Sequence, residues 1–264
     1  MRAMRSVFLI LAAATALAPL SNYNIARERA ANCERFRVET DASAAVWGPP
    51  ISASGGASAR GAAWTPIAAI GDSPIYEARG AIPDAVARRV VAEAEARWAA
   101  TGDRSSRFTM SAGHRECHAA DLPRTRRWLS AFTERELPRL DLPEAASAYA
   151  VYDALVLRYD GPAAGQPVHA DYATVTLNFA LNGGFEGGGT RFEALDRTLR
   201  APPGAALAHA SARRHAGAPT TNGTRYAMVV FCSDAADVDH GRCGPPAPRF
   251  ASTRGIELRV SRRA

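Results

Sequence analysis

The sequence predicts an α+β protein, mainly β, in which N-terminal helices pack on one side of a double-stranded β-helix, the jelly roll. Hydrophobic residues recur every three or four positions before residue 140 and every second position from Tyr149 onward, which are the periods of helices and strands. The later half is divided into short segments by glycine and proline, a pattern typical of sandwich and barrel folds. With 264 residues, the chain is long enough for one domain with a substantial core.

The first 26 residues have the composition of a signal peptide or signal anchor. Arg2 and Arg5 precede an apolar run from Val7 to Leu20, and this run is shorter than a comfortable membrane span. We therefore expect entry into the secretory pathway, either to the lumen of the endoplasmic reticulum or out of the cell. An uncleaved anchor and an organelle transit signal are the alternatives. We expect no stable membrane span beyond this segment.

A flexible linker is expected at residues 27–73, because residues 51–63 are rich in glycine, serine and alanine and show little periodicity. The folded domain is then expected at residues 74–235. Residues 236–264 are polar and rich in proline and arginine, which predicts a C-terminal tail. Within this tail, residues 256–260 either add an edge strand or stay loose.

Two helices are predicted before the main group of strands. The first opens at Ile82-Pro83-Asp84, where proline is tolerated in the first turn and aspartate suits the positive end of the helix dipole. The second runs from about Leu122 to Leu137. Each helix has one apolar face that requires a sheet or another helix to cover it. These faces consist of Val86, Val90, Val91, Ala94 and Trp98, and of Trp128, Leu129, Phe132 and Leu137.

Between the two helices lies the segment His114-Arg-Glu-Cys-His118. Two histidines four positions apart would bind a metal ion from one helical turn, but the H-E-x-x-H order of metalloproteases is absent. Gly113 and the polar surroundings favour a loop. We therefore expect His114 and His118 to have surface or capping roles.

Strands are predicted where residues alternate, or where β-branched and aromatic residues cluster between turns. A short strand is expected at residues 75–78, before the first helix. The other strands are expected at residues 149–158, 174–181, 190–192, 197–200, 205–208 and 225–232.

Charge and cysteine content restrict the partners and the compartment. The 32 basic residues are all arginines, scattered along a chain of net charge +6, so we do not expect a nucleic-acid partner. An even number of cysteines behind a signal-like segment fits an oxidising compartment. Cys232 and Cys243 would close a short loop, but three pairings are open, and Cys232 as a simple buried thiol is the alternative. The four cysteines are Cys33, Cys117, Cys232 and Cys243.

The strongest chemical pattern is His169-Ala-Asp171, followed by His215. Residues two apart on a strand point to the same side, so His169 and Asp171 converge on one metal ion, and a third ligand must come from another strand. Two imidazoles and one carboxylate form the facial triad that leaves open positions on a redox iron. A closed zinc site would use four ligands, usually with thiolates, and no cysteine lies between residues 155 and 231.

Four segments of the chain carry a family resemblance. They are Leu157–Tyr159, His169–Asp171, the Phe-Glu-Gly-Gly-Gly-Thr-Arg-Phe run at 185–192, and residues 215–226, which end in Gly-Thr-Arg-Tyr. Together they resemble the catalytic domain of Fe(II)/2-oxoglutarate-dependent dioxygenases of the prolyl 4-hydroxylase superfamily, and most closely the lysyl hydroxylase (procollagen-lysine 5-dioxygenase) domain. The resemblance covers roughly residues 78–231. An H-x-D motif alone is a weak signal, but the distal His215 and an arginine ten residues beyond it make the pattern specific.

The resemblance implies a set of cofactors and the residues that bind them. The cofactors are Fe(II), 2-oxoglutarate and O₂, and ascorbate is expected to keep the iron reduced. The remote carboxylate of 2-oxoglutarate needs a fixed cation, and an arginine offers a planar fork for it. His209 is expected to be a neighbour of the site, because its spacing to the arginine is too long for the distal ligand. The expected residues are His169, Asp171 and His215 for iron, and Arg225, Tyr159, Thr176 and Asn178 for 2-oxoglutarate.

The same resemblance implies that residues 74–235 form a dioxygenase domain. This domain is expected to hydroxylate an unactivated C–H bond of a peptidyl proline or lysine, with decarboxylation of 2-oxoglutarate to succinate. The substrate would then be a peptide or protein. A dioxygenase acting on a free amino acid or small molecule is one alternative, and a non-catalytic jelly-roll binding module is another. The intact set of three metal ligands plus Arg225 argues against the binding module.

Overall fold

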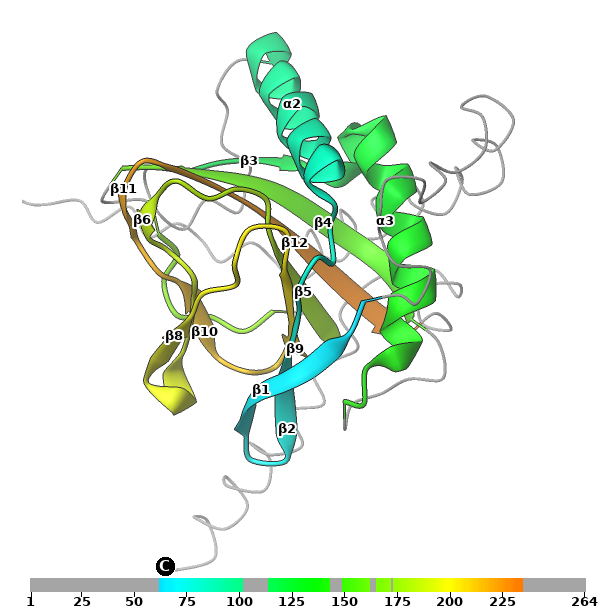
Figure 1. Cartoon of the computed structure of the whole chain (residues 1–264), viewed down its shortest axis with the longest axis vertical. Coiled ribbons are helices and arrows are strands. Elements are labelled where there is room, and N and C mark those ends of the chain that lie inside the picture. The colour runs from blue at the N-terminus through cyan, green and yellow to red at the C-terminus, as the bar shows by residue number, and fades with distance from the viewer. Residues whose placement is uncertain (1–61, 102–113, 143–148, 162–164, 172, 235–264) are drawn as a thin grey trace, which may run out of the picture.

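Figure 1 shows the computed structural model, which describes residues 62–101, 114–142, 149–161, 165–171 and 173–234. The expected signal segment, most of the expected linker and the C-terminal tail lie outside the described residues. The described part consists of two α-helices, short 3₁₀ turns and three antiparallel sheets.

An antiparallel sheet of seven strands forms the larger wall of the fold. Its order is β1-β2-β9-β5-β12-β4-β3, so strands that are distant in the sequence lie side by side (Figure 1). Strand β12 pairs with both β4 and β5. The bounds are Trp64–Ile70 for β1, Ser73–Ala78 for β2, His114–His118 for β3, Tyr149–Asp160 for β4, Val175–Ala180 for β5, Ala206–Ala210 for β9 and Thr224–Asp234 for β12.

Five shorter strands form the second wall. They make a three-stranded sheet, β10-β7-β8, and a two-stranded sheet, β11-β6. Phe192 and Leu199 of the smaller sheet pack with Ile75 and Leu207 of the large sheet in one buried cluster. The two walls therefore enclose an interior, and the predicted jelly roll is confirmed. The bounds are Glu186–Gly187 for β6, Thr190–Phe192 for β7, Arg197–Leu199 for β8, His215–Gly217 for β10 and Thr220–Asn222 for β11.

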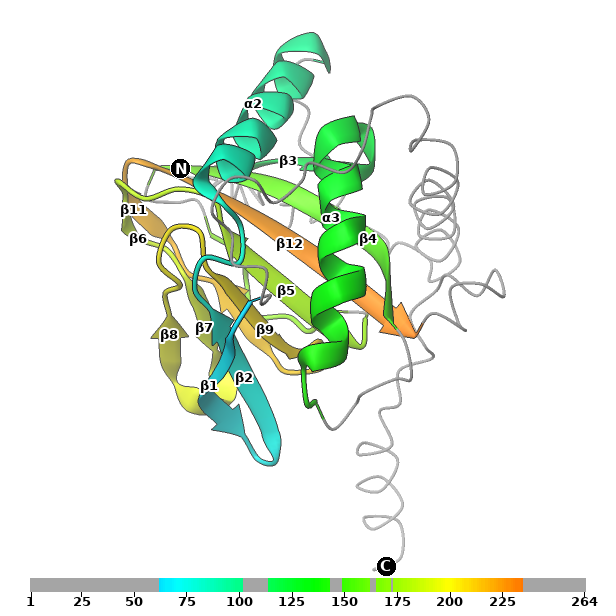
Figure 2. The ribbon, with the colours of Figure 1, turned by 45° about the vertical axis from the view of Figure 1, so that its right-hand side comes forward.

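Two helices cover the outer face of the large sheet (Figure 2). They are α2, Asp84–Thr101, and α3, Pro123–Glu136. Phe132 of α3 lies with its ring centroid 5.1 Å from that of Phe179 on β5, and also stacks on Trp128. This aromatic contact joins the helix to the middle of the sheet. None of the described helices has the length and apolar character needed to span a bilayer.

Strands β4 and β12 divide their side chains between two environments. Val156 and Met228 belong to the main core that includes the helices. Leu157 and Ala227, their chain neighbours, belong to a separate cluster on the inner face. This alternation is the normal consequence of a two-residue period. The large sheet therefore supports the helices with one face and lines the jelly-roll interior with the other.

The predicted linker was too long. Strand β1 occupies Trp64–Ile70, inside the range 27–73, and pairs with β2 across a tight turn at Gly71. Proline usually argues against a strand, and strand β1 was not predicted because it contains Pro66. The register shifts between Pro66 and Ala68, which is how an edge strand accommodates a proline.

The predicted loop at residues 114–118 was also wrong, because this segment is strand β3 at the edge of the large sheet. The strand was not predicted because its polar residues suggest an exposed segment. In fact His114 and Glu116 are buried and pair in register with Tyr159 and Leu157 of β4. Their side chains therefore share the inner face with those residues.

Two of the four cysteines lie in the described part of the chain. Cys117 and Cys232 are free and buried, and the expected pairing of Cys232 with Cys243 involves a residue outside the described part of the chain. Burial raises the pKa of the Cys117 thiol to about 12 and raises the pKa of Cys232 further. Both therefore behave as small apolar core residues. Cys33 and Cys243 lie outside the described residues.

We expect the aromatic contact under α3 to hold this helix on the sheet. Phe132→Ala should destabilise the protein by about 3–5 kcal/mol, since it leaves a cavity between Trp128 and Phe179. Arg88→Ala, on the exposed side of α2, is the control and should change stability by less than about 0.5 kcal/mol. Chemical denaturation of both variants measures the difference, and equal effects would show that the aromatic contact is not needed.

Candidate metal centre

The H-x-D segment is held against β10 by its own backbone. His169 and His215 exchange two backbone hydrogen bonds, each 2.8 Å from N to O, which form an isolated antiparallel bridge. The N–H of Asp171 donates to the carbonyl oxygen of Ser211 at 2.9 Å. Two segments more than forty residues apart in the sequence are thus placed side by side. These backbone hydrogen bonds bring the three predicted ligands together.

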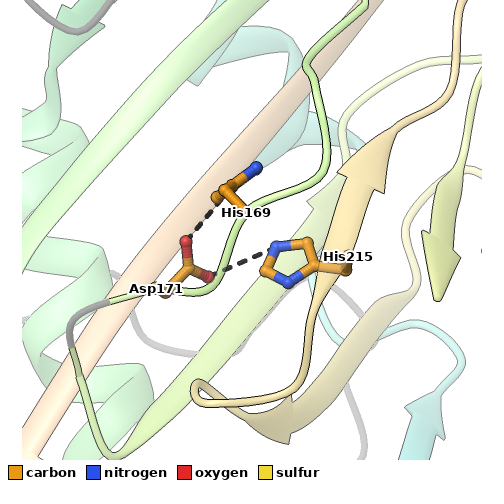
Figure 3. A group of neighbouring side chains, drawn as sticks. All are labelled: His169, Asp171 and His215. Carbon is orange, nitrogen blue, oxygen red and sulfur yellow. Dashed lines mark ion pairs between the residues drawn. The ribbon is translucent and has the colours of Figure 1, made fainter. Parts of the chain in front are cut away.

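The side chains of His169, Asp171 and His215 converge on one point (Figure 3). One ligand atom from each lies within 4.8 Å of the others. Both imidazole Nε2 atoms are 3.4 Å from the carboxylate, His169 from Oδ1 and His215 from Oδ2. Two nitrogens and one oxygen on one side of a cavity match the ligand set of a non-haem iron site with open positions.

The two histidines are oriented by carbonyl groups. His169 Nδ1 lies 2.8 Å from the Pro167 carbonyl oxygen, and His215 Nδ1 lies 2.9 Å from that of Arg213. A carbonyl oxygen only accepts, so each Nδ1 carries the proton and each Nε2 presents a lone pair to the centre. This second contact fixes the tautomer, as is common for histidine ligands of metals.

Asp171 is oriented by a hydroxyl group. The Thr176 hydroxyl donates to Asp171 Oδ2 at 2.7 Å, and a second hydroxyl, that of Ser211, lies 2.8 Å from the Thr176 oxygen. Although burial alone would raise the pKa of Asp171, the neighbouring His215 and His169 lower it to about 2. Burial lowers the pKa of His215. At neutral pH these two groups are therefore in the forms that bind a metal cation.

Arg225 and Tyr159 lie on the same inner face, opposite each other on β12 and β4. The guanidinium carbon of Arg225 is 4.8 Å from the centre of the Tyr159 ring, close enough for a cation–π contact. Its Nη1 is buried and has no hydrogen-bond partner in the structure, and burial lowers the pKa of the group. No carboxylate in the described part of the chain forms an ion pair with it, so an anionic ligand would complete the charge balance.

One cavity connects the triad to the arginine. Its lining includes the three predicted metal ligands, Arg225, Tyr159 and Asn178, which places six of the seven predicted site residues in one space. On the same faces of β4 and β12 as Tyr159 and Arg225, the lining is apolar and consists of Leu155, Leu157, Ala227, Val229 and Phe231. Such a wall keeps water away from the polar centre.

Thr176, the seventh predicted residue, does not line this cavity. Its side chain is fully buried and is directed at Asp171. It therefore orients Asp171, and the expectation that Thr176 lines the same pocket as Asn178 was wrong. Thr176 and Asn178 both point to the inner face of β5, so the sequence could not show which of them lines the cavity. The position of the H-x-D loop decides that Thr176 contacts Asp171 instead.

The glycine run packs closely on Arg225. Gly187, Gly188 and Gly189 all have positive φ angles, which side chains rarely adopt. A Cβ added at Gly188 would lie 2.8 Å from Arg225 Cδ and 3.1 Å from the Phe185 ring. The Glu-Gly-Gly-Gly-Thr motif therefore lets the backbone approach the arginine side chain and hold it in the cavity.

Comparison with curated proteins identifies relatives of part of this chain. Over 69 residues it is 48% identical to multifunctional procollagen lysine hydroxylase and glycosyltransferase LH3 of Rattus norvegicus, which covers 24% of this chain and 9% of that protein. It is 46% identical over 69 residues to procollagen-lysine,2-oxoglutarate 5-dioxygenase 1 of the same species, covering 24% and 10%. The match thus spans about a tenth of the length of these relatives. No protein-family model matches the chain.

Several solved structures are similar to this chain. A viral collagen prolyl hydroxylase from Paramecium bursaria Chlorella virus-1 has a TM-score of 0.45 and 15% identity, covering 60% of this chain and 94% of that chain. A Pseudomonas putida prolyl-4-hydroxylase has a TM-score of 0.44 and 17% identity, covering 62% and 94%. A prolyl hydroxylase from Trichoplax adhaerens, in complex with a peptide fragment, has a TM-score of 0.49 and 14% identity, covering 62% and 86%.

The chain resembles the 2-oxoglutarate–Fe(II) oxygenases. The resemblance that the motifs predicted is confirmed by the match to the lysyl hydroxylases, over about a quarter of the sequence.

We expect the three converging side chains to bind one divalent metal ion. His215→Ala should abolish binding of Mn(II), a redox-stable probe, since two ligands cannot hold the ion in an open site. Thr176→Val keeps the volume but removes the hydrogen bond to Asp171, and should weaken binding about 10- to 100-fold. Calorimetric titration measures both, and undiminished affinity in His215→Ala would exclude this metal centre.

Proposed function

We propose that this protein is an Fe(II)/2-oxoglutarate-dependent dioxygenase that hydroxylates an unactivated C–H bond. The observation that carries the proposal is the presence of two complementary groups in one cavity. One is a set of two imidazoles and a carboxylate with converging ligand atoms, and the other is a partly buried arginine whose Nη1 is buried and has no hydrogen-bond partner. A metal alone would not account for the arginine, and an anion alone would not account for the triad.

The donor set fits the proposed cofactors. His169, Asp171 and His215 would hold Fe(II), which leaves positions for the keto acid end of 2-oxoglutarate and for O₂. Arg225 would bind the remote carboxylate, where a planar guanidinium provides two parallel N–H donors. The net reaction converts substrate, O₂ and 2-oxoglutarate to hydroxylated substrate, succinate and CO₂. When bound, the iron supplies the activation of O₂ that this reaction requires.

The protein's own residues provide position and shielding. Thr176 and the carbonyl groups behind the two histidines fix the ligand atoms in place. Tyr159 holds the guanidinium of Arg225 from one side and Gly188 allows it to approach from the other. The apolar wall of Leu155, Ala227 and Val229 excludes water, which strengthens every electrostatic contact within the cavity.

A peptidyl proline or lysine is the substrate that we propose. The curated relatives of the matched segment are named for the hydroxylation of procollagen lysine, and this supports a side chain within a peptide or protein. The signal-like segment at residues 1–26 supports action in the secretory pathway. Ascorbate as a reductant of the iron is part of the same proposal.

The proposed activity predicts succinate release from 2-oxoglutarate in the presence of Fe(II) and O₂, even without a primary substrate. His215→Ala should abolish it. Arg225→Ala should mainly raise the 2-oxoglutarate concentration for half-maximal rate, because it removes binding of the remote carboxylate. A binding module would release no succinate, and an unchanged 2-oxoglutarate requirement in Arg225→Ala would exclude the role of that residue.

The substrate class is tested separately. Incubation with peptide libraries that contain proline or lysine, with Fe(II) and 2-oxoglutarate, should give products heavier by one oxygen atom. A product only from free amino acids or other small molecules would replace the peptide proposal without affecting the dioxygenase assignment.

The glycine run provides a further test. Gly188→Ala should raise the 2-oxoglutarate requirement, because the added methyl group would displace Arg225. Gly184→Ala is the matched control, since Gly184 also has a positive φ angle but a Cβ there meets nothing within 4 Å. Both variants pay a similar backbone strain of about 1–2 kcal/mol. Titration of 2-oxoglutarate in both separates this strain from the contact with Arg225, and equal effects would contradict that contact.

A further inference from the structure

A third histidine lies beside the metal centre without belonging to it. His209 on β9 is fully buried, and its ring centroid is 4.8 Å from that of His215 and 5.0 Å from that of Phe192. It is not among the residues whose ligand atoms converge. A buried imidazole this close to a metal site has a role to be explained.

Both nitrogens of His209 are engaged. Nδ1 lies 3.0 Å from the carbonyl oxygen of Ala210, and Nε2 lies 3.2 Å from Nδ2 of Asn178. The carbonyl oxygen can only accept, so Nδ1 carries the proton. The atom that faces Nε2 is the Asn178 amide nitrogen, which can only donate a hydrogen bond. Nε2 therefore has a lone pair, and the Asn178 amide must donate to it.

This tautomer decides the orientation of an amide in the cavity. Asn178 uses one of its two N–H groups on His209, which leaves the second N–H and the carbonyl oxygen. The side chain lines the cavity between the triad and Arg225. It lies on the inner face of β5, beside its register partner Val229 on the neighbouring strand β12. Asn178 is thus a polar group that faces the space between the two anchoring ends of the cavity.

We infer that His209 is a positioning residue, which holds the amide of Asn178 so that its second N–H donates to an anionic ligand bound between the metal triad and Arg225. This inference rests on the proposed function, in which that ligand is 2-oxoglutarate. His209 acts only through Asn178 and does not touch the ligand. The same hydrogen bond engages the Nε2 lone pair and so prevents His209 from binding the metal in place of His215.

The tautomer is tested on the wild-type, metal-free protein. Long-range ¹H–¹⁵N correlation spectra of the histidine side chains distinguish protonated from unprotonated ring nitrogens. We expect His209 to have a protonated Nδ1 and an unprotonated Nε2. A protonated Nε2 would overturn the inference, because the amide of Asn178 would then have to turn its carbonyl oxygen towards the ring.

The coupling to the ligand is tested by a double-mutant cycle. His209→Phe keeps an aromatic ring against Phe192 and His215 but removes the acceptor, and Asn178→Ala removes the amide. Each should weaken binding of 2-oxoglutarate to the Mn(II)-loaded protein about fivefold, the usual effect of one hydrogen bond. Combined, they should have little more effect than Asn178→Ala alone, because His209 acts only through the amide. Additive losses would indicate a purely structural role and overturn the inference.

The two hypotheses fail in different ways. If the wild-type protein binds Mn(II) but no 2-oxoglutarate, the proposed function and the ligand of this inference both fall. The tautomer spectrum would still decide whether His209 orients Asn178. If 2-oxoglutarate binds with the same affinity to wild type and Asn178→Ala, the dioxygenase proposal stands and the role of Asn178 and His209 is excluded.

Discussion

The charge of Arg225, whose Nη1 is buried without a hydrogen-bond partner, is the constraint on which the rest of the site depends. A guanidinium inside a jelly roll is costly unless an opposite charge accompanies it, and the described chain supplies none in contact. The structure compensates in part through the face of Tyr159 and through close packing against Gly188. In the proposed function the remaining cost is offset when the remote carboxylate of 2-oxoglutarate binds at this end of the cavity. The triad supplies the complementary preference for a metal ion at the other end.

The same strands that hold the site also fasten the helices. Arg158 and Tyr226, the chain neighbours of Tyr159 and Arg225, both bind Glu95 of α2, at 3.0 and 2.7 Å. Alternate residues of β4 and β12 thus reach the helix outside and the cavity inside. A shift of one residue in this register would turn the residues that face α2 towards the cavity, and the residues that face the cavity towards α2. The packing of α2 and the position of the guanidinium are therefore set by one common register.

Much of this arrangement could be predicted from local pattern, and the exceptions have physical reasons. The convergence of His169, Asp171 and His215 could be predicted because these residue types in this spacing are typical of one metal-binding pattern. Strand β3 was missed because its buried polar residues resemble a loop, and β1 because it contains a proline. The role of Thr176 depends on which inner-face residue of β5 meets the H-x-D loop. That contact is set by the backbone bridge between distant segments, which no local pattern encodes.

The histidines show most clearly where sequence reasoning ends. His169, His209 and His215 all direct Nδ1 at a backbone carbonyl oxygen, so all three present an Nε2 lone pair to the interior. What separates a ligand from a neighbour is the group that this lone pair meets. For His169 and His215 it is the carboxylate of Asp171, an anion that could hold a metal ion together with them. For His209 it is the neutral amide of Asn178, which donates a hydrogen bond and leaves nothing for a metal. Identical side chains with the same tautomer therefore have different chemistry because of one opposing group.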